Sequence, residues 1–378
     1  MARLWFLSSM EGSPWGASEE LWSSAALLAL ADGHEVTVCM RRWEQVPPRL
    51  SELERAGAVL RWRTPLPLKL PFEVPLVQRF RDAKLPPLRL EERPADVVCW
   101  SHGALPDVTW QAWAQRLGSR VRAAGVPYVT VSHGFDGAPP ASEGQRQLGL
   151  AHFAGAARAL FLGPASIELA ERWLAARLPG AGVFRNAVTL VDAPPLPAEP
   201  AVRMACVGRL VAWQKGQDLL LDALGRAKGL PDTWELSFYG EGPDRAYLEQ
   251  LTAMYGLAGK VRFRGHESDL ARIWAESELL VLPSRIEGLS LAALEAMSAG
   301  RPVLATAVGE MRTWVTERTG FVAAPDADSL AGALEQAAAA RRDWGALGAE
   351  AREAARSRYA AGDPARELLD TMLSVSRA

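Results

Sequence analysis

The sequence predicts an α/β protein made of two doubly wound, Rossmann-like domains that face a central crevice. Strand-like apolar runs alternate with helix-length amphipathic segments along the chain, which is the rhythm of parallel sheets covered by helices. This rhythm stops at the proline-rich stretch APPLPAEP (193–200) and then starts again. The length of 378 residues also fits two domains, at roughly 100–200 residues per domain.

Each half supplies its own set of strands and helices. In the first half the predicted strands are 2–8, 33–40, 95–100, 126–133 and 158–163, and the predicted helices are 17–31 and 165–176. In the second half the predicted strands are 202–208, 234–240, 260–265, 278–284 and 302–306, and the predicted helices are 217–227, 244–256, 269–277 and 290–300. The carboxyl ends of parallel strands should meet at the crevice, where ligands of doubly wound sheets bind.

These elements predict the domain boundaries. The first domain should span 1–192 and the second 201–357, with 193–200 as the linker. The remaining segment, 358–378, is predicted as a C-terminal helix that packs back on the first domain.

Composition and charge exclude some classes of partner. The net charge of −2 gives no strong field for nucleic acid, so no nucleic-acid partner is expected. No stretch approaches the roughly 20 apolar residues that a membrane-spanning helix needs. The three cysteines, Cys39, Cys99 and Cys206, lie in strand-like runs without metal-ligand spacing, which predicts free buried thiols in a cytoplasmic protein.

The segment 41–93 is more basic than the rest, with 12 Lys or Arg residues against 7 Asp or Glu residues. One interpretation is a solvated, arginine-rich loop. The other is a rim that meets an anionic acceptor or the inner face of a membrane, to which the protein would bind peripherally.

The strongest motif is PSRIEGLSLAALEAM (283–297), in which a strand ends, a short loop follows and a helix begins. Glu287 lies in the loop, where it can accept hydrogen bonds from sugar hydroxyls, and Glu295 lies in the helix, where it can accept from a ribose. The alternative is a capped helix with Glu295 at the surface. A helix N-terminus suits a diphosphate, and its free N–H groups here belong to Gly288, Leu289, Ser290 and Leu291.

The second motif is VGRLVAWQKG (207–216), directly after the first strand of the second half. Arg209 offers a planar fork for phosphate oxygens, and Lys215 offers a point charge. A basic loop in this place can also be merely solvated. Beside an anion-binding helix, however, the two cations favour a role in neutralising a nucleoside diphosphate.

Other candidates are single residues. Gly16, in the loop between the first strand and helix, allows close approach of a ligand, although no G-x-G-x-x-G pattern is present. His133 ends a strand and is either structural or a donor-site residue; His102 is a weaker candidate and His34 is interpreted as structural. Asp326-Ala327-Asp328 could pass for a metal site, but Asp328 or Ser329 is the expected N-cap of a helix, and no metal site is predicted.

The runs GRLVAWQKGQDLLLDAL, YGEGPDRAYLEQL, VRFRGHESDLARIWAESELLVLPSRIEGLSLAALEAMSAGRPVLAT and GASEELWSSAALLALADGHEV resemble glycosyltransferase family 4. The resemblance is dense over about 202–330 and looser over 1–40 and 95–190. It implies the GT-B fold, an acceptor-binding first domain, a donor-binding second domain, and sugar transfer with retention and without a divalent metal.

The resemblance also implies roles for matching residues. Arg209 and Lys215 would bind the donor phosphates, Glu287 the sugar, and Glu295 the ribose. The amides of Gly288–Leu291 would contact diphosphate and sugar, Gly16 would lie near the diphosphate, His266 near the nucleobase and His133 near the donor sugar. Two departures stand out: Val308-Gly309-Glu310 replaces a common Gly-Gly pair, and Arg185-Asn186-Ala187 replaces Pro-Asn-Gly.

The predicted function is therefore transfer of a hexose from a UDP- or GDP-sugar to an acceptor hydroxyl, in the synthesis of cell-surface glycan or glycolipid. The acceptor would be a glycan or a lipid-linked molecule, the nucleotide sugar would be a co-substrate, and no cofactor is expected. Two alternatives are a phosphorylase or epimerase on the same fold and a non-catalytic nucleotide-sugar sensor. Trp15, Trp110 and Trp113 are candidates to line the acceptor side of the crevice, although aromatic residues are more often core.

Overall fold

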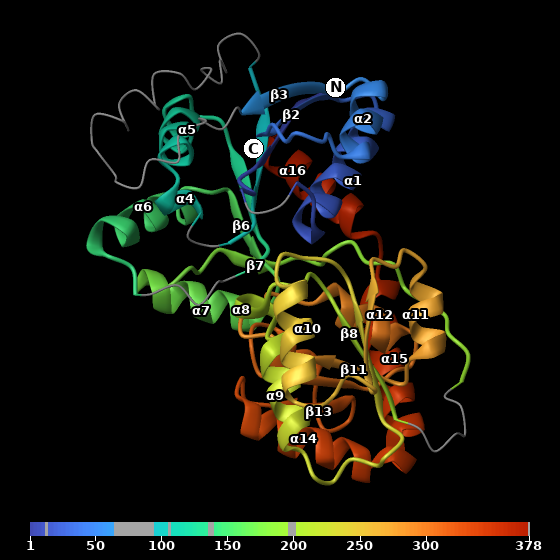
Figure 1. Cartoon of the computed structure of the whole chain (residues 1–378). Helices are drawn as coiled ribbons and strands as arrows, with labels where there is room; N and C mark the ends of the chain where they lie inside the picture. The colour runs from blue at the N-terminus through green and yellow to red at the C-terminus, as the bar shows by residue number, and fades with distance from the viewer. Residues whose placement is uncertain (12–13, 64–93, 105–106, 135–139, 196–201, 377–378) are drawn as a thin grey trace. The chain divides into compact units, whose positions relative to one another are not determined.

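The computed structural model describes residues 1–11, 14–63, 94–104, 107–134, 140–195 and 202–376. It divides into two compact units. Unit 1 consists of Met1–Ala187 and Gly362–Ala378, and unit 2 of Val188–Ala361. Figure 1 shows each unit as a sheet with helices on both of its faces. Of the basic segment 41–93, residues 64–93 lie outside the described residues.

Unit 1 contains a seven-stranded parallel sheet of order β3-β2-β1-β4-β5-β6-β7. Its strands are β1 (Arg3–Ser8), β2 (Glu35–Arg41), β3 (Val59–Arg63), β4 (Val97–His102), β5 (Tyr128–Ser132), β6 (Arg158–Phe161) and β7 (Ala181–Val183). Its helices are α1 (Ala17–Ala31), α2 (Pro48–Arg55), α4 (Asp107–Trp110), α5 (Ala112–Ala123), α6 (Glu143–Phe153), α7 (Pro164–Leu174) and α16 (Pro364–Ser376). Every residue of β4 and β5 is buried, as expected for strands covered on both faces.

Unit 2 contains a six-stranded parallel sheet of order β10-β9-β8-β11-β12-β13. Its strands are β8 (Arg203–Val207), β9 (Glu235–Tyr239), β10 (Val261–Gly265), β11 (Leu279–Leu282), β12 (Val303–Thr306) and β13 (Gly320–Ala323). Its helices are α8 (Ala212–Lys215), α9 (Gln217–Arg226), α10 (Arg245–Met254), α11 (Leu270–Glu276), α12 (Leu291–Ser298), α13 (Met311–Trp314), α14 (Ala327–Ala339), α15 (Trp344–Ala360) and the 3₁₀ turn Arg341–Asp343.

Both sheets therefore share one strand order, with the reversal beside the first strand of each unit. The reversal lies between β1 and β4 in unit 1 and between β8 and β11 in unit 2. The connections that leave these two strands run in opposite directions, which opens a depression at the carboxyl edge. The prediction of two doubly wound Rossmann-like sheets is confirmed.

The C-terminal helix α16 completes unit 1 rather than unit 2. It contacts α1 and β4, and Figure 1 shows it, in red, beside α1. Leu369 and Met372 of α16 are fully buried, and Arg366 forms an ion pair with Asp32 at the end of α1. The apolar face of this helix therefore belongs to the core of unit 1.

Three predicted boundaries need correction. The second domain is predicted to end at 357, but α15 continues to Ala360 and unit 2 to Ala361. Residues 188–192, predicted as the end of the first domain, belong to unit 2, where Val191 N–H donates to Ser298 Oγ at 2.8 Å. The N-cap of α14 is Asp326, whose carboxylate accepts from Ser329 N–H at 2.8 Å, and not Asp328 or Ser329. Asp328 lies two residues later, in the first turn of α14, where its side chain pairs with Arg226.

The three cysteines are free and buried, as predicted, and burial raises the pKa of each thiol. None of the helices in the described part of the chain is both long and apolar enough to span a bilayer.

Candidate functional site

The centre of the candidate site is an ion pair at the strand reversal of unit 2. Lys215 ends the short helix α8, which follows β8, and Glu287 lies in the loop that follows β11. Lys215 Nζ lies 2.7 Å from Glu287 Oε2, and Ser284 Oγ lies 3.2 Å from the same oxygen. The structure thus brings together the predicted cation of one motif and the predicted carboxylate of the other.

Backbone contacts fasten these two loops to each other. The N–H groups of Arg285 and Ile286 donate to Gln214 O at 2.9 and 3.2 Å. Gly216, at φ +68°, packs so tightly on Pro283 that an added Cβ would lie 1.9 Å from the Pro283 carbonyl oxygen. A side chain at position 216 is therefore excluded by both backbone conformation and space.

Arg285 adds a side-chain link between the same loops. Its guanidinium makes a two-pronged ion pair with Asp218, at 2.7 and 2.8 Å, and also donates to Ala212 O at 2.7 Å. Asp218 lies in the first turn of α9, and Ala212 begins α8. Arg285 therefore holds both ends of the segment that carries Lys215.

The start of α12 presents backbone donors beside Glu287. Ser290 is the N-cap, and its hydroxyl accepts from Ala293 N–H at 3.4 Å. Among described residues, none accepts a hydrogen bond from the N–H groups of Gly288, Leu289 or Ser290. The positive end of the helix and these donors could hold an anion.

The loop after β12 supports this segment from behind. Gly309, at φ +52°, lies so close to the loop that an added Cβ would be 1.9 Å from Glu287 O, and Glu310 N–H donates to Gly288 O at 2.8 Å. The sequence Val308-Gly309-Glu310 thus retains the glycine that this contact requires.

Arg209, His266 and Glu295 lie in the same unit but outside this cluster of contacts. Arg209 and His266 are exposed, and neither side chain forms an ion pair with a described residue. Glu295, on α12, is partly buried, and burial raises the pKa of its carboxyl group to about 7. Leu291 is the first residue of α12.

In unit 1, Gly16 is the N-cap of α1 in extended backbone. An added Cβ would only meet Glu19 Oε2 at 3.6 Å, an ordinary contact, so the fold itself does not demand glycine here. Glu19 is fully buried, accepts from Ser8 and Ser18 hydroxyls at 2.9 and 2.6 Å, and has a pKa raised by burial.

Two arginines hold the loop that leads to Gly16. Glu11 pairs with Arg41, at the end of β2, at 2.8 Å and with Arg63, at the end of β3, at 2.6 Å. Arg63 is 7% exposed, also donates to Ser8 O at 2.6 Å, and stacks 3.7 Å from the ring centre of Trp113. Trp113 therefore packs inside unit 1, and the side chain of Trp110 lies outside the described residues.

His133 lies directly after β5 and contacts Asn186, which the sequence also singled out. His133 Nδ1 lies 2.9 Å from Asn186 Oδ1, and its ring meets Phe184 edge to face. Burial lowers the pKa of His133 to about 3, so the ring is neutral. Nδ1 donates to the amide oxygen in this arrangement, which leaves Nε2 as an acceptor, and no described residue pairs with Nε2.

His102 belongs to a buried network and not to an open site. Its Nδ1 lies 3.1 Å from Ser9 Oγ, and its Nε2 lies 3.0 Å from His152 Nε2. Asp107 accepts from Ser9 Oγ at 3.1 Å. Burial lowers the pKa of His102 well below its usual value, so its neutral ring helps to hold the ends of β1 and β4 together. His34 Nδ1 accepts from Ala2 N–H at 3.0 Å, a structural role.

Within the described residues, no group of three His, Cys, Asp or Glu side chains is placed to hold a metal ion. Sequence reasoning missed Arg285, Asp218, Arg63 and His152. The PSRIEG motif did contain Arg285, but no local signal marks a partner 67 residues away in the chain.

A family model described as glycosyl transferases group 1 matches residues 201–339. A lipopolysaccharide core biosynthesis mannosyltransferase of Rhizobium meliloti, LpsB, is 36% identical over 150 residues, which are 37% of this chain and 42% of that protein. A D-inositol 3-phosphate glycosyltransferase of Geodermatophilus obscurus is 36% identical over 167 residues, 40% of this chain and 36% of that protein. The chain thus matches less than half the length of these relatives.

Solved structures resemble the whole chain. A sucrose-phosphate synthase from Thermosynechococcus elongatus has a TM-score of 0.74 at 20% identity and covers 99% of both chains. The Anabaena protein HepE in complex with UDP has a TM-score of 0.71 at 20% identity and covers 98% of this chain and 100% of its own. At such identity the likeness shows the fold.

Proposed function

We propose that this chain, which has the GT-B fold and carries a glycosyl transferases group 1 domain over residues 201–339, is a retaining glycosyltransferase. It would move a sugar from a nucleoside diphosphate sugar to an acceptor hydroxyl. The observation that carries the proposal is the Lys215–Glu287 pair, at 2.7 Å, beside N–H groups at the start of α12 for which the described residues supply no acceptor. A cation, a helix N-terminus and a carboxylate at one strand reversal suit a diphosphate joined to a sugar.

Donor binding would exchange the partners of this ion pair. The diphosphate takes hydrogen bonds from Lys215 and from the amides of Gly288–Leu291, while Glu287 accepts from a sugar hydroxyl. Arg209, exposed on the neighbouring loop, supplies the second cation. Glu295 accepts from the ribose, Gly16 gives the diphosphate room, and His266 contacts the nucleobase.

The transfer step needs no enzyme nucleophile. The bond from sugar C1 to the diphosphate oxygen breaks, and the acceptor oxygen bonds to C1 from the same face. The acceptor proton passes to the departing phosphate oxygen. Lys215 and Arg209 stabilise the charge that develops on the leaving group, which makes a divalent metal unnecessary.

His133 would act through its unprotonated Nε2. A neutral ring whose Nδ1 donates to Asn186 can accept a hydrogen bond from a donor-sugar hydroxyl but cannot supply a proton. His133 would therefore orient the sugar.

The donor class is tested by calorimetric titration with UDP, GDP and ADP, first in EDTA and then with Mg²⁺. We expect one nucleotide to bind without metal, and the UDP complex of the structurally similar HepE favours UDP. Binding of none, with or without Mg²⁺, contradicts the proposal; binding only with Mg²⁺ contradicts its metal independence.

Product analysis tests the reaction. NMR of the anomeric proton should show the configuration of the donor sugar kept in the product. Conversion of the nucleotide sugar without an acceptor would identify an epimerase, and binding without turnover across an acceptor panel would identify a sensor. The acceptor is proposed to belong to cell-surface glycan or glycolipid synthesis, as the name of LpsB suggests for that relative. Peripheral attachment to an anionic membrane is tested by co-sedimentation with anionic vesicles.

A further inference from the structure

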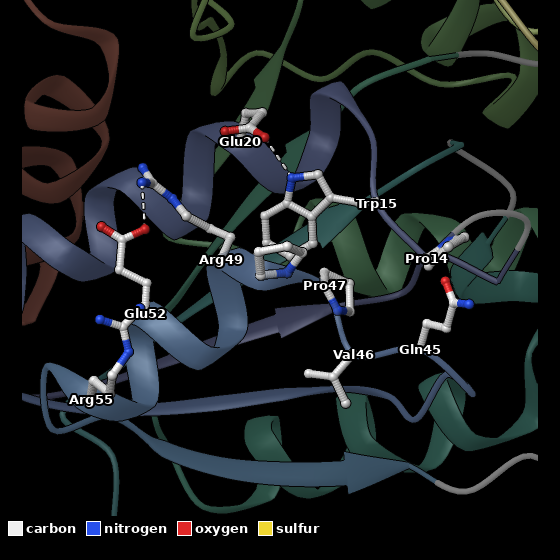
Figure 2. Close-up of a pocket in the computed structure, with 10 residues that line it drawn as sticks. Pro14, Trp15, Glu20, Gln45, Val46, Pro47, Arg49, Glu52 and Arg55 are labelled. Atoms are coloured by element: carbon white, nitrogen blue, oxygen red, sulfur yellow. Dashed lines mark hydrogen bonds and ion pairs between the residues drawn. The ribbon is translucent and has the colours of Figure 1, made fainter. Parts of the chain in front are cut away.

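Unit 1 contains a cavity of about 700 Å³ beside the loop that ends at Gly16. It lies past the carboxyl ends of the neighbouring strands β1 and β2, between the loops that follow them and α2. Figure 2 shows Trp15 in its middle, between Pro47 on one side and Arg49 on the other. The polar or aromatic side chains that line it are Trp15, Glu20, Gln45, Arg49, Glu52 and Arg55.

The walls of the cavity are held in place by contacts within unit 1. Arg49 donates to Ser24 of α1 at 2.9 Å and pairs with Glu52, one turn further along α2, at 2.9 Å. Pro47 and Pro48 begin α2 and give one wall a fixed backbone direction. The indole N–H of Trp15 donates to Glu20 Oε1 at 2.5 Å, which fixes the plane of the ring.

The charges in the cavity balance. Two arginines face two carboxylates, Arg49 is already paired with Glu52, and Glu20 already accepts from Trp15. A site for a phosphate or an anionic lipid would instead present an excess of cations. The amide, guanidinium and carboxylate groups of the lining offer both hydrogen-bond donors and acceptors to the vicinal hydroxyls of a sugar. The indole ring of Trp15 offers an apolar face to the C–H groups of a sugar ring.

We propose that this cavity binds an uncharged sugar ring of the acceptor, stacked on Trp15. The inference rests on the proposed function and deepens it, because it makes the acceptor a neutral saccharide at its reacting end. Trp15 directly precedes Gly16, the residue of unit 1 for which the family resemblance implies a place near the diphosphate. The volume lies within the roughly 300–1,000 Å³ range of small-molecule sites, enough for more than one sugar ring.

Binding can be measured without donor or turnover. Saturation-transfer NMR would use methyl α-mannoside, methyl β-glucoside and methyl β-galactoside as probes, with glucose 6-phosphate as the anionic counterpart. We expect transfer to at least one neutral glycoside, strongest at the ring protons of one face, and weaker transfer to the phosphate.

A blocking variant and a matched control locate the site. Val46 lines the cavity and is 46% exposed, so Val46→Trp should fill the space without disturbing the core. Val183, on β7 of the same unit, is 44% exposed and lies outside the cavity lining, so Val183→Trp is the same change elsewhere. Saturation transfer should fall by about tenfold or more in Val46→Trp and persist in Val183→Trp, since the occupied volume excludes the ring.

Trp15→Phe tests the stacking itself. It keeps an aromatic face but loses the N–H that orients the ring, so we expect weaker binding of the neutral glycoside. Trp15→Ala removes the aromatic face and should abolish this binding. Three outcomes overturn the inference. They are no saturation transfer to any neutral glycoside in the parent protein, equal transfer in Val46→Trp and the parent, and stronger transfer to glucose 6-phosphate than to the neutral glycosides. Calorimetry with UDP on Val46→Trp tests the proposed function separately, because Val46 is not among the proposed donor contacts.

Discussion

The loops that follow the first strand of each unit are held by different means. In unit 2 the loops with Lys215 and Glu287 are joined through backbone, by the bonds to Gln214 O and the tight approach of Gly216 to Pro283. In unit 1 the loop with Glu11 is held by arginine side chains from β2 and β3. Backbone contacts between loops need glycines and fixed spacing, whereas side-chain contacts can come from any strand that ends nearby.

The part of the chain that matches a known family lies in the unit whose loops are joined through backbone. The matching family model covers 201–339, within unit 2, and no part of it reaches the arginine-held loop of unit 1. Under the proposed function, the donor is bound by the unit 2 loops that backbone contacts hold together. The acceptor is bound beside the unit 1 loop that arginine side chains hold.

The largest effect is expected for Lys215→Ala. The variant should lower kcat by about 10²–10³, the usual loss when one preorganised electrostatic donor is removed from a charged transition state. Steady-state kinetics at saturating donor measures it. Lys228→Ala, an exposed lysine of unit 2, is the matched control and should keep full turnover.

Full turnover in Lys215→Ala would break the assignment of the ion pair to the reaction. A fall of equal size in Lys228→Ala would point to general charge effects on unit 2.

The next largest effect is expected in unit 1. Arg63→Ala should destabilise that unit by about 2–4 kcal/mol, because it leaves buried acceptors and part of the Glu11 charge without their partner. Thermal unfolding measures this change. UDP affinity should change little, since Arg63 acts on the proposed donor site only through the loop that leads to Gly16. Weakened UDP binding with unchanged stability would contradict the view of Arg63 as a clamp within unit 1.

For Arg285→Ala we expect the reverse balance, with a smaller loss of stability and a clear loss of turnover. Its side chain is about one-third exposed, so the loss of stability should be smaller, about 1–2 kcal/mol. Because it fixes both ends of the Lys215 segment, kcat should fall by about tenfold while the donor KM changes less. Arg285→Lys should recover only part of kcat, since an ammonium cannot make the two-pronged bond to Asp218. A loss of stability with full kcat would leave Arg285 a purely structural residue.

Features that depend on a local pattern of residues could be predicted from the sequence. Strand and helix periodicity predicted both sheets, and the run around Glu287 and the run around Lys215 predicted residues that the structure brings within 2.7 Å. Spacing alone could not predict that Glu11 would find Arg41 and Arg63, because those partners meet only after three strands align. Sequence reasoning ranked His102 below His133, but it could not show that packing places the His102 ring between Ser9 and His152.

The smallest effect is expected for Glu295. Here burial, rather than a backbone or side-chain contact, sets the property of the site, which is the pKa of a carboxyl group. The folded protein holds the pKa of this carboxyl at about 7, above its ordinary value of 4.5. Between these values the folded state keeps a proton that the unfolded chain releases, so this group's contribution to stability is present at low pH and is lost as pH rises toward 7.

The same shift predicts the pH dependence of donor binding. Only the ionised carboxylate is a full acceptor for ribose hydroxyls, so UDP affinity should rise as pH passes from 6 to 8, by about tenfold at most. Calorimetry at both values measures it. Phosphate ionisation contributes in the same range, so the decisive quantity is the ratio between the parent protein and Glu295→Gln, whose neutral amide does not titrate. An identical pH dependence in both proteins would remove Glu295 from the ribose site and leave its raised pKa a consequence of packing.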